Sequence, residues 1–249
     1  MHMVLSFLVF YITQTIAKAV PSNLAAFLNK IKADGACNDP FPGSFYDKEG
    51  GSKSFRYCKG DGYIYLKGPS DKLANMDIDC DGAKNPLCPV RAGSDTQLWT
   101  SFRDSVRSYG ISDLDASIHN YVVLGNADDD HTPGYTTFRP QDYGVQPLSL
   151  MAVVCNSQLF YGIWGDENGS DGPPLVGEAS ISLARLCFGD SMTNDNGHGP
   201  ADVLYIAFTG QNAVPGGDGA AWKAKSSKEF QNHEAFNDLG DSLVKQIHV

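Results

Sequence analysis

Two strand-like runs flank a two-residue turn in the stretch LSLMAVVCNSQLFYGIW, which covers residues 148–164. Both runs are apolar and contain the β-branched and aromatic side chains that favour strands. Asn156 and Ser157 lie between them, and Asn tolerates the left-handed backbone that a tight hairpin turn requires. The stretch therefore predicts a β-hairpin near the middle of the chain.

Further elements are predicted on both sides of this hairpin. Short apolar runs indicate strands at 63–66, 121–124 and 203–208. Apolar residues at helical spacing indicate helices at 22–35, 95–109 and 180–188, and the polar tail 226–249 is expected to be helical as well. The expected end residues are Ser22 or Asn23 as the first N-cap, Gly110 as the second C-cap, and Ser180 and Gly189 around the third helix.

The number of short strands and of turn-forming residues decides the fold class. The chain has 249 residues, of which 42% are apolar, and it contains 26 Gly and 13 Pro. That length suffices for one sizeable domain, and the turn-rich composition argues against a helical bundle. We therefore expect a mainly β fold, with a single domain, a β-barrel-like core and a few peripheral helices.

The charge balance restricts the class of partner. Asp and Glu number 29 against 19 Lys and Arg, which gives a formal net charge of -10. Nucleic-acid binding needs a basic face, so no nucleic-acid partner is expected. Adhesion to an anionic membrane is disfavoured for the same reason. A cationic ligand suits such a surface, although acidic surfaces often serve only solubility.

The amino-terminal segment resembles an export signal. Residues 4–16 are mostly apolar, and Ala17-Lys18-Ala19 supplies a small-x-small cleavage pattern. We therefore predict a signal peptide at 1–19 and a secreted single catalytic domain at 20–249. The apolar run is too short for a membrane span, which needs about 20 residues.

Six cysteines remain in the predicted mature chain. An even number in an exported protein indicates disulfides, and six cysteines allow 15 pairings. We predict that Cys80–Cys88 closes a local loop and that Cys155–Cys187 ties a strand to a helix. Cys37–Cys58 is then the remaining pair.

An acidic motif follows the predicted strand at 63–66. Asp77, Asp79 and Asp81 alternate along the chain and Gly82 follows, as at the start of a calcium loop. An EF-hand needs a Glu at the twelfth position, which here is Cys88, so that interpretation fails. A turn held by Asx hydrogen bonds, another cation site and a negative subsite for a cationic ligand remain as interpretations. We predict no metal ligand set, because the histidines are scattered and no HExxH motif is present.

Two carboxylates in the segment 161–180 are candidates for acid–base chemistry. Asp166 follows a predicted strand in a Gly-flanked turn, and Glu178 lies among apolar residues before a predicted helix. Hydrolysis of a glycosidic bond needs one protonated and one ionised carboxyl group. Apolar neighbours would raise the pKa of Glu178, so it is the expected acid, and Asp166 is the expected base.

Neighbouring aromatic residues could complete such a site. Trp164 and Tyr161 are expected to stack on sugar faces. The alternative interpretation is structural: Asp166 is a turn residue, and Glu178 is a carboxylate satisfied by backbone N–H groups at a helix N-terminus. The spacing of the two acids leaves both interpretations open.

Several long motifs resemble those of a known family. They are Leu114-Asp115-Ala116-x-Ile118-His119, Tyr121-Val122-Val123, Gln146-Pro147-Leu148-Ser149, Met151–Cys155, Tyr161–Gly169 and Gly177–Leu183. Together they are similar to the fungal chitosanases of glycoside hydrolase family 75, from about Val20 to Phe208. The resemblance implies an endo-acting, inverting hydrolase of chitosan in which Asp166 and Glu178 are the essential carboxylates.

The resemblance also gives the acidic residues a role. Chitosan is cationic when its amines are protonated, so Asp79 and Asp81 are expected to contact substrate, with further candidates at Asp77, Asp128, Asp129 and Asp130. No cofactor is expected, since proton transfer and water attack need none, and we expect a monomer.

Two other points remain open at this stage. Asn168-Gly169-Ser170 is a glycosylation sequon beside Asp166 and is expected to be unmodified or to point away from the substrate.

The competing functions are a non-catalytic carbohydrate-binding or wall-loosening protein, and a secreted structural or effector protein that binds a host partner.

Overall fold

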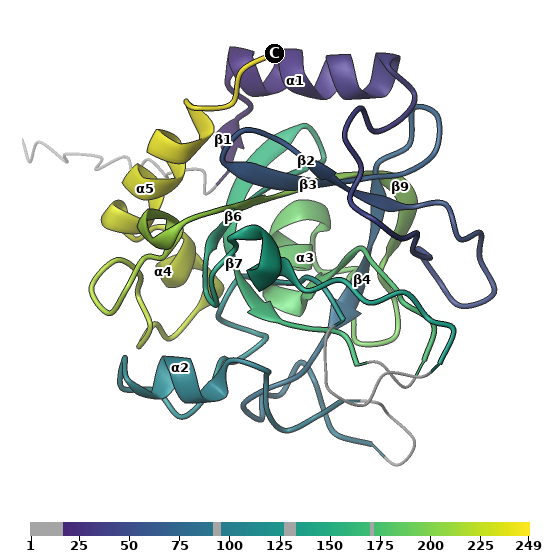
Figure 1. Ribbon diagram of the computed structural model, residues 1–249. Coiled ribbons are helices and arrows are strands. Elements are labelled where there is room, and N and C mark those ends of the chain that lie inside the picture. Colours follow the sequence, from purple (N-terminus) through teal and green to yellow (C-terminus); the bar gives the residue numbers. More distant parts are fainter. Residues whose placement is uncertain (1–16, 92–95, 127–132, 170–171) are drawn as a thin grey trace, which may run out of the picture.

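A β-sheet forms the centre of the molecule, and helices lie at its periphery (Figure 1). The computed structural model describes residues 17–91, 96–126, 133–169 and 172–249, and nine strands in these ranges form one sheet. The strands are β1 Lys18–Ala19, β2 Arg56–Lys59, β3 Tyr63–Lys67, β4 Ala74–Asp79, β5 Tyr121–Val123, β6 Leu150–Cys155, β7 Gln158–Asp166, β8 Glu178–Ser180 and β9 His198–Phe208. The α-helices are α1 Ser22–Ala33, α2 Arg103–Arg107, α3 Ile181–Phe188, α4 Ser227–Gln231 and α5 Glu234–Val244, and the 3₁₀ turns are η1 Pro140–Tyr143 and η2 Gln211–Ala213. The prediction of a mainly β fold is confirmed.

Six of the strands pair in a circuit that returns to its start. β7 pairs with β5, β5 with β8, β8 with β4, β4 with β9, β9 with β6, and β6 with β7. The pairs β4–β8 and β5–β7 are parallel, and the other four are antiparallel. Since β5 and β8 lie between β7 and β4, residues from four separate segments meet on one part of the sheet.

The central hairpin forms as predicted. β6 and β7 pair over six residues, from Leu150 opposite Ile163 to Cys155 opposite Gln158. Asn156 and Ser157 both have positive φ, at 47° and 59°, as a turn matched to the twist of the strands requires. All six residues of β6 are buried, which explains its continuous apolar run.

The first and last helices pack near each other. α1 buries Leu24, Phe27 and Ile31, as its spacing predicted. The predicted N-cap is wrong, because Pro21 occupies that position and no side chain caps the helix. The Asn23 amide instead donates to the carbonyls of Val244 and Ile247 at the end of the chain. The tail is helical as predicted.

The helix predicted at 95–109 is wrong in extent. α2 covers Arg103–Arg107, and Ser108 rather than Gly110 is its C-cap. The preceding backbone is held by acidic side chains instead: the N–H of Gln97 donates to Asp81, and that of Thr100 to Asp113. These bonds to distant residues replace the local hydrogen bonds of a helix.

The three predicted disulfides are present. Cys37–Cys58, Cys80–Cys88 and Cys155–Cys187 are all bonded. The third joins the end of β6 to α3, whose predicted cap is also confirmed, since the Ser180 hydroxyl accepts the N–H of Leu183. Among the described residues, the strands that sequence patterns missed are β1, β2, β4 and β8, which are short or carry polar residues.

The predicted leader lies mostly outside the described residues, but its last two residues belong to the sheet. Lys18 pairs with Leu159 and Ala19 with Gln158. The Lys18 ammonium lies 2.8 and 2.9 Å from the two Asp241 carboxylate oxygens and 5.0 Å from the centre of the Tyr161 ring. No helix in the described ranges is long and apolar enough to span a membrane.

Candidate active site

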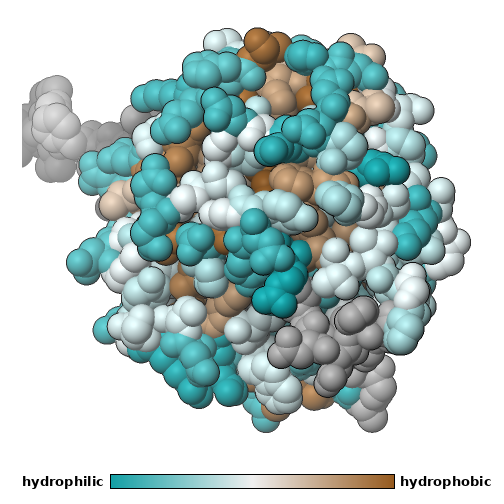
Figure 2. Space-filling view, in the orientation of Figure 1, coloured by the Kyte–Doolittle hydropathy of each residue, from teal (hydrophilic) through white to brown (hydrophobic). Residues whose placement is uncertain are grey.

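A polar cleft of about 410 Å³ opens where β4, β5, β7 and β8 meet. Asp79, Asp166 and Glu178 lie in its lining together with Ile78, Cys80, Asp81, Thr96, Gln97, Val123, Glu167, Asn168, Gly169 and Asn194. None of these described lining residues is Lys or Arg, so the cleft is acidic. Figure 2 shows that the face seen in the orientation of Figure 1 is mainly polar, with small apolar areas between hydrophilic side chains.

Strand register brings the two candidate catalytic carboxylates to one row of the sheet. Asp166 of β7 pairs with Val123 of β5, and Val123 pairs with Glu178 of β8. Two strand spacings of about 4.8 Å place the Asp166 and Glu178 α carbons about 10 Å apart. A shift of register after Val122 skips Gly165 and turns Asp166 toward the cleft.

The Asp166 carboxylate is held on one side by three donors. Its Oδ1 accepts the Ser101 N–H at 2.8 Å, the Ser101 hydroxyl at 2.5 Å and the Glu167 N–H at 2.8 Å. Its Oδ2 is buried and has no hydrogen-bond partner among the described residues. Asp166 is 4% exposed, so its carboxylate is largely removed from water. Hydrogen bonds from described residues replace that water at Oδ1 but not at Oδ2.

Burial shifts the ionisation of Asp166. Desolvation raises its pKa from 3.8 to about 6, and the nearby charge of Asp113 adds to that effect. The hydroxyl and N–H of Ser101 and the N–H of Glu167 act in the opposite direction, because they stabilise the charged form. The sequence suggested that the polar turn would keep the pKa of Asp166 at its usual value. Burial outweighs the polarity of the turn, so the pKa is raised instead.

Glu178 occupies a strand rather than the mouth of a helix. It is the first residue of β8, half-buried, and the following helix begins three residues later. Its neighbour Ala179 is fully buried and, as the next residue along a strand, points to the opposite face. The Ala179 side chain therefore lies on the face of the strand opposite the Glu178 side chain.

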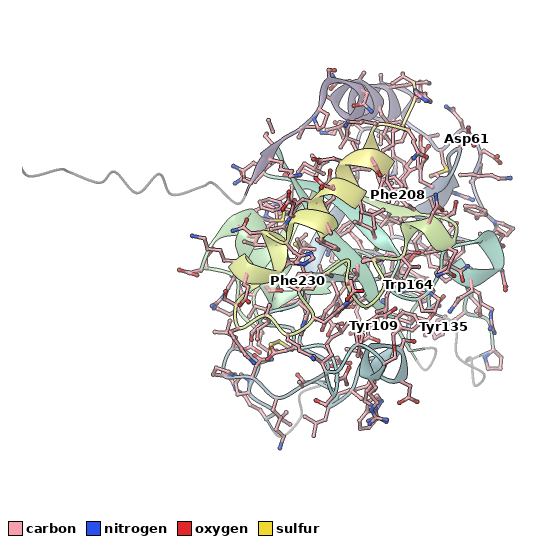
Figure 3. The ribbon with its side chains drawn as sticks, turned by 90° about the vertical axis from the view of Figure 1, so that its left-hand side faces the viewer. Asp61, Tyr109, Tyr135, Trp164, Phe208 and Phe230 are labelled. Atoms are coloured by element: carbon pink, nitrogen blue, oxygen red, sulfur yellow. A yellow bond between two sulfur atoms is a disulfide. The ribbon has the colours of Figure 1, made fainter. Side chains whose placement is uncertain are left out.

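The two aromatic residues expected to stack on sugars are wrong for that role. Trp164 and Tyr161 are both 0% exposed. Trp164 lies in the body of the molecule (Figure 3), packs edge-on against Phe102 and donates its indole N–H to the Asp166 carbonyl. The Tyr161 hydroxyl donates to Asp241 at 2.7 Å. Both residues support the strand that carries Asp166.

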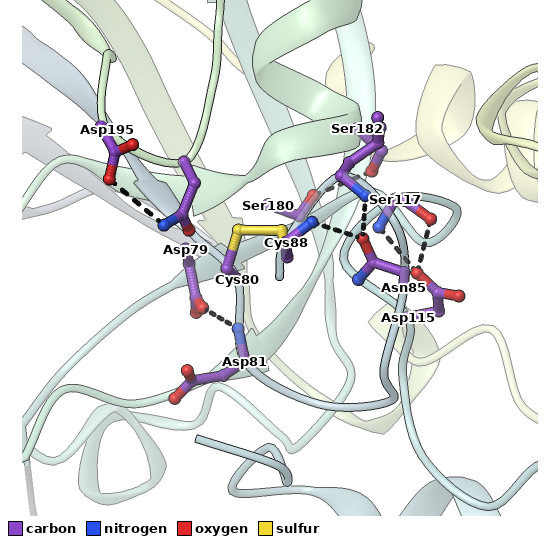
Figure 4. The surroundings of a disulfide bond; sticks show 12 residues. Asp79, Cys80, Asp81, Asn85, Cys88, Asp115, Ser117, Ser180, Ser182 and Asp195 are labelled. Atoms are coloured by element: carbon purple, nitrogen blue, oxygen red, sulfur yellow. Dashed lines mark hydrogen bonds between the residues drawn. A yellow bond between two sulfur atoms is a disulfide. The ribbon is translucent and has the colours of Figure 1, made fainter. Parts of the chain in front are cut away.

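Asp79 and Asp81 lie at the cleft beside the Cys80–Cys88 disulfide (Figure 4). The Asp81 N–H donates to Asp79 Oδ1 at 2.6 Å, so the Asx-turn interpretation of this segment is confirmed. Asp79 is 6% exposed, and burial raises its pKa well above the usual range, with a further contribution from the charges of Asp166, Glu178 and Asp81.

One group of carboxylates is compact enough to be considered for a cation. Oxygens of Asp79, Asp81 and Asp166 lie within 4.8 Å of one another, which is the one such group found among the described residues. Acidic clusters are common without a metal, and no His or Cys joins this one. These three carboxylates are part of the cleft lining, and no described residue other than an acid joins them.

The sequence analysis missed two residues of the cleft wall. Trp99 and Ser101 line a hollow that also contains Asp81 and Asp166. Trp99 is 52% exposed, and Ser101 supplies two of the donors to Asp166. The prediction of a continuous helix concealed both. Trp99 lies off the apolar face formed by Leu98, Phe102 and Val106, which is the sequence signal that would have singled it out.

The remaining predicted residues are placed as follows. Asp77 is half-buried on β4 and does not line the described cleft. Asn168 is half-buried at the cleft, and its Nδ2 donates to the Leu175 carbonyl. Asp128, Asp129, Asp130 and Ser170 of the sequon lie outside the described residues.

Comparison with known proteins agrees with the resemblance seen in the motifs. The family model described as fungal chitosanase of glycosyl hydrolase group 75 matches residues 76–246. An endo-chitosanase of Aspergillus fumigatus is 47% identical over 237 residues, which cover 94% of this chain and 93% of that protein. Endo-chitosanase B of Aspergillus oryzae is 42% identical over 240 residues, with 94% and 93% covered.

Proposed function

The chain belongs to the fungal chitosanases of glycosyl hydrolase group 75 and is a chitosan-cleaving glycoside hydrolase, and from that premise we propose that Asp166 and Glu178 carry out an inverting, endo-acting cleavage of its β-1,4 linkages. One observation carries this proposal: Asp166 and Glu178 occupy a single row of the sheet, with Val123 of β5 between them, in the lining of the same cleft. The non-catalytic alternative would not need two such carboxylates to face each other.

The geometry fits inversion better than retention. Inverting enzymes hold their carboxyl groups about 6.5–9.5 Å apart, which leaves room for a water, whereas retaining enzymes hold them about 5–5.5 Å apart. The α carbons of Asp166 and Glu178 are separated by two strand spacings, about 10 Å, and both side chains point into the cleft. That separation leaves space for a sugar linkage and one water.

The surroundings of Asp166 suit it to the role of base. Three donors at Oδ1 stabilise the ionised form, and two of them are backbone N–H groups that cannot accept a proton. Asp166 takes a proton from water as the water oxygen attacks the anomeric carbon. Glu178 gives its proton to the glycosidic oxygen, so the leaving sugar departs as a neutral alcohol.

The acidic cleft suits a cationic polymer. Asp81 and Glu167 lie in the cleft lining with the catalytic pair, and no described lining residue is basic. Glucosamine units carry ammonium groups at acidic pH, and negative clefts attract such groups and raise their local concentration. The exposed face of Trp99 offers an apolar platform for a sugar ring, which Trp164 and Tyr161 cannot offer.

The remaining proposals concern setting and architecture. We infer secretion, which three disulfides support because such bonds persist in oxidising compartments. We also infer that the six strands that pair in a circuit form the predicted barrel-like core. We further infer that the enzyme acts as a monomer without a cofactor.

The proposal is tested by release of reducing sugar from chitosan, chitin and carboxymethylcellulose. Asp166→Asn and Glu178→Gln are each expected to lower kcat on chitosan by about 10³-fold or more, with an unchanged circular-dichroism spectrum. Proton NMR of the first products is expected to show the α-anomer. The matched control is Asp61→Asn, an exposed carboxylate far from Trp164 in Figure 3. Retained cleavage in either cleft variant would remove that residue from the mechanism.

A further inference from the structure

An unsatisfied oxygen lies at the centre of the proposed active site. Asp166 Oδ2 is shielded from solvent and has no donor among the described residues, whereas Oδ1 of the same carboxylate has three. A buried charged acceptor without a donor is costly, so native structures rarely leave one unexplained. A group that can supply a proton to this oxygen is therefore expected nearby.

Asp79 is the neighbouring residue that can supply it. An Asp79 carboxylate oxygen lies within 4.8 Å of one from Asp166, a gap that one side-chain rotation or one bridging water closes. Asp79 Oδ1 already accepts the Asp81 N–H, which leaves Oδ2 as the place for a proton. Ionised carboxylates only accept hydrogen bonds, so Asp79 can donate only if it is protonated.

The number of donors decides which of the two acids holds the proton. Asp166 accepts three hydrogen bonds, whereas Asp79 accepts one from the Asp81 N–H and has the Tyr121 hydroxyl as its only other neighbouring donor among the described residues, so the negative charge is better stabilised on Asp166. Both side chains are almost fully buried, and none of the described lining residues is a cation that could neutralise a second charge. Two carboxylates this close share one proton, as in other acidic pairs.

We propose that Asp79 is a positioning residue of the active site, which stays protonated and donates its O–H to Asp166 Oδ2, directly or through one water. The proposal rests on the role of Asp166 as base given above. The bond fixes the plane of the Asp166 carboxylate. Asp79 thus acts through Asp166 and not on the sugar.

The charged groups around the pair favour this arrangement. Asp81 follows β4, Glu178 lies on β8, Glu167 follows β7, and Asp113 lies in the loop before β5. All are acidic, and burial together with the charges of Asp166, Glu178 and Asp81 raises the pKa of Asp79 well above its usual range. The Tyr121 hydroxyl on β5 donates to the Asp81 carbonyl.

Two Asp79 variants of similar size test whether Asp79 donates a hydrogen bond or acts as a negative ion. In Asp79→Asn the amide N–H donates the same bond as the protonated acid, whereas Asp79→Leu removes it. We expect Asp79→Asn to keep kcat within about threefold and to leave the acid limb of the kcat/KM profile in place. In Asp79→Leu the pKa of Asp166 rises, so the acid limb is expected to move to higher pH by about one unit. Asp61→Asn is the control for simple loss of a charge.

Equal acid limbs in the Asn and Leu variants would overturn the proposal. So would a large rise in KM for Asp79→Asn, because it would mean that ionised Asp79 binds a cationic group. A direct readout is ¹³C NMR titration of the side-chain carboxyl carbons in the wild type, assigned with Asp79→Asn. Asp79 is expected to lose its proton only after Asp166 as the pH rises, and ionisation of Asp79 before Asp166 would refute its role.

This readout needs neither substrate nor a folded Leu variant. If the wild type fails to cleave chitosan, the proposed function fails while the titration still decides the state of Asp79. If the titration shows an ionised Asp79 in an active enzyme, the further inference fails alone.

Discussion

Ser101 binds Asp166 twice, through its main-chain N–H at 2.8 Å and its hydroxyl at 2.5 Å, both to the same carboxylate oxygen. The two residues are 65 positions apart in the sequence. Ser101 can reach Asp166 because the backbone before α2 forms bends and a turn beside the cleft instead of a continuous helix. The pair therefore links the shape of one loop to the ionisation of the proposed base.

Replacement of Ser101 by Ala is expected to shift the pH dependence. The lost hydroxyl stabilised ionised Asp166, so the pKa of Asp166, already raised to about 6, rises further. A base must be ionised, and the rate is lost as pH falls through that pKa. The acid limb of kcat/KM is therefore expected to move up by about half to one pH unit, as measured on soluble chitosan.

Ser108→Ala is the matched control for this change. Its hydroxyl donates to the Ser105 carbonyl at an exposed helix end and touches no cleft residue. If the acid limb moves equally in both variants, the Ser101 hydroxyl does not set the pKa of Asp166.

Trp99→Ala is expected to weaken substrate binding. The indole is 52% exposed beside the cleft, where it can cover the apolar face of a sugar ring. KM for long chitosan oligomers should rise about tenfold or more, while kcat stays within about threefold, because the residue is not part of the carboxylate row. Steady-state kinetics with oligomers of defined length measures this effect.

The second tryptophan provides the contrast. Trp164→Phe removes the bond from the buried indole to the Asp166 carbonyl and leaves a cavity, so we expect a loss of stability of about 1–3 kcal/mol with little change in KM. Thermal unfolding and kinetics separate the two outcomes. A KM change confined to Trp164→Phe would reverse the assignments.

Lys18 is expected to contribute to stability. Its ammonium contacts Asp241 and the Tyr161 ring, and its strand pairs with β7. Asp241 is 43% exposed, so solvent limits the ion pair to at most about 1 kcal/mol. A chain that begins at Val20 should unfold about 2–4 °C below one that begins at Lys18. Lys18→Met, which keeps β1, should account for part of the loss, and equal melting temperatures would show that β1 is dispensable.

Asn168 is expected to remain without a glycan in the active enzyme. A glycan would attach to Nδ2, which donates to the Leu175 carbonyl from a half-buried position in the cleft lining. Intact mass before and after endoglycosidase treatment measures occupancy, and Ser170→Ala removes the sequon while it keeps Asn168. Full occupancy with normal activity would contradict this expectation.

Local patterns were sufficient for the hairpin and for α3. The apolar runs at β6 and β7 consist of residues that favour strands, and the turn between them consists of residues that accept positive φ. Ser180 and Gly189 mark α3 at both ends because caps act within a few residues. The disulfide pairs also followed from spacing. Such features depend on neighbours in the chain, which the sequence lists directly.

The segment before α2 shows where this reasoning ends. Leu98, Phe102 and Val106 have helical spacing, yet Leu98 is 43% exposed and the backbone around it is bound to Asp81, Asp113 and Asp166. Long-range partners outweighed the local preference. Trp164 was likewise misjudged, since the sequence shows an aromatic residue but not whether the fold buries it.

The sequence alone determined the strand-rich character, the sulfur pairs and the identity of two acids worth attention, because residue type and short-range spacing govern these features. Tertiary structure decided that Asp166 and Glu178 share one row, that Ser101 and Asp79 lie beside Asp166, and that Trp99 rather than Trp164 is exposed. Hydrogen-bond register between strands distant in sequence sets these neighbours, and the ionisation of a carboxyl group depends on the neighbours and burial that only the folded chain provides.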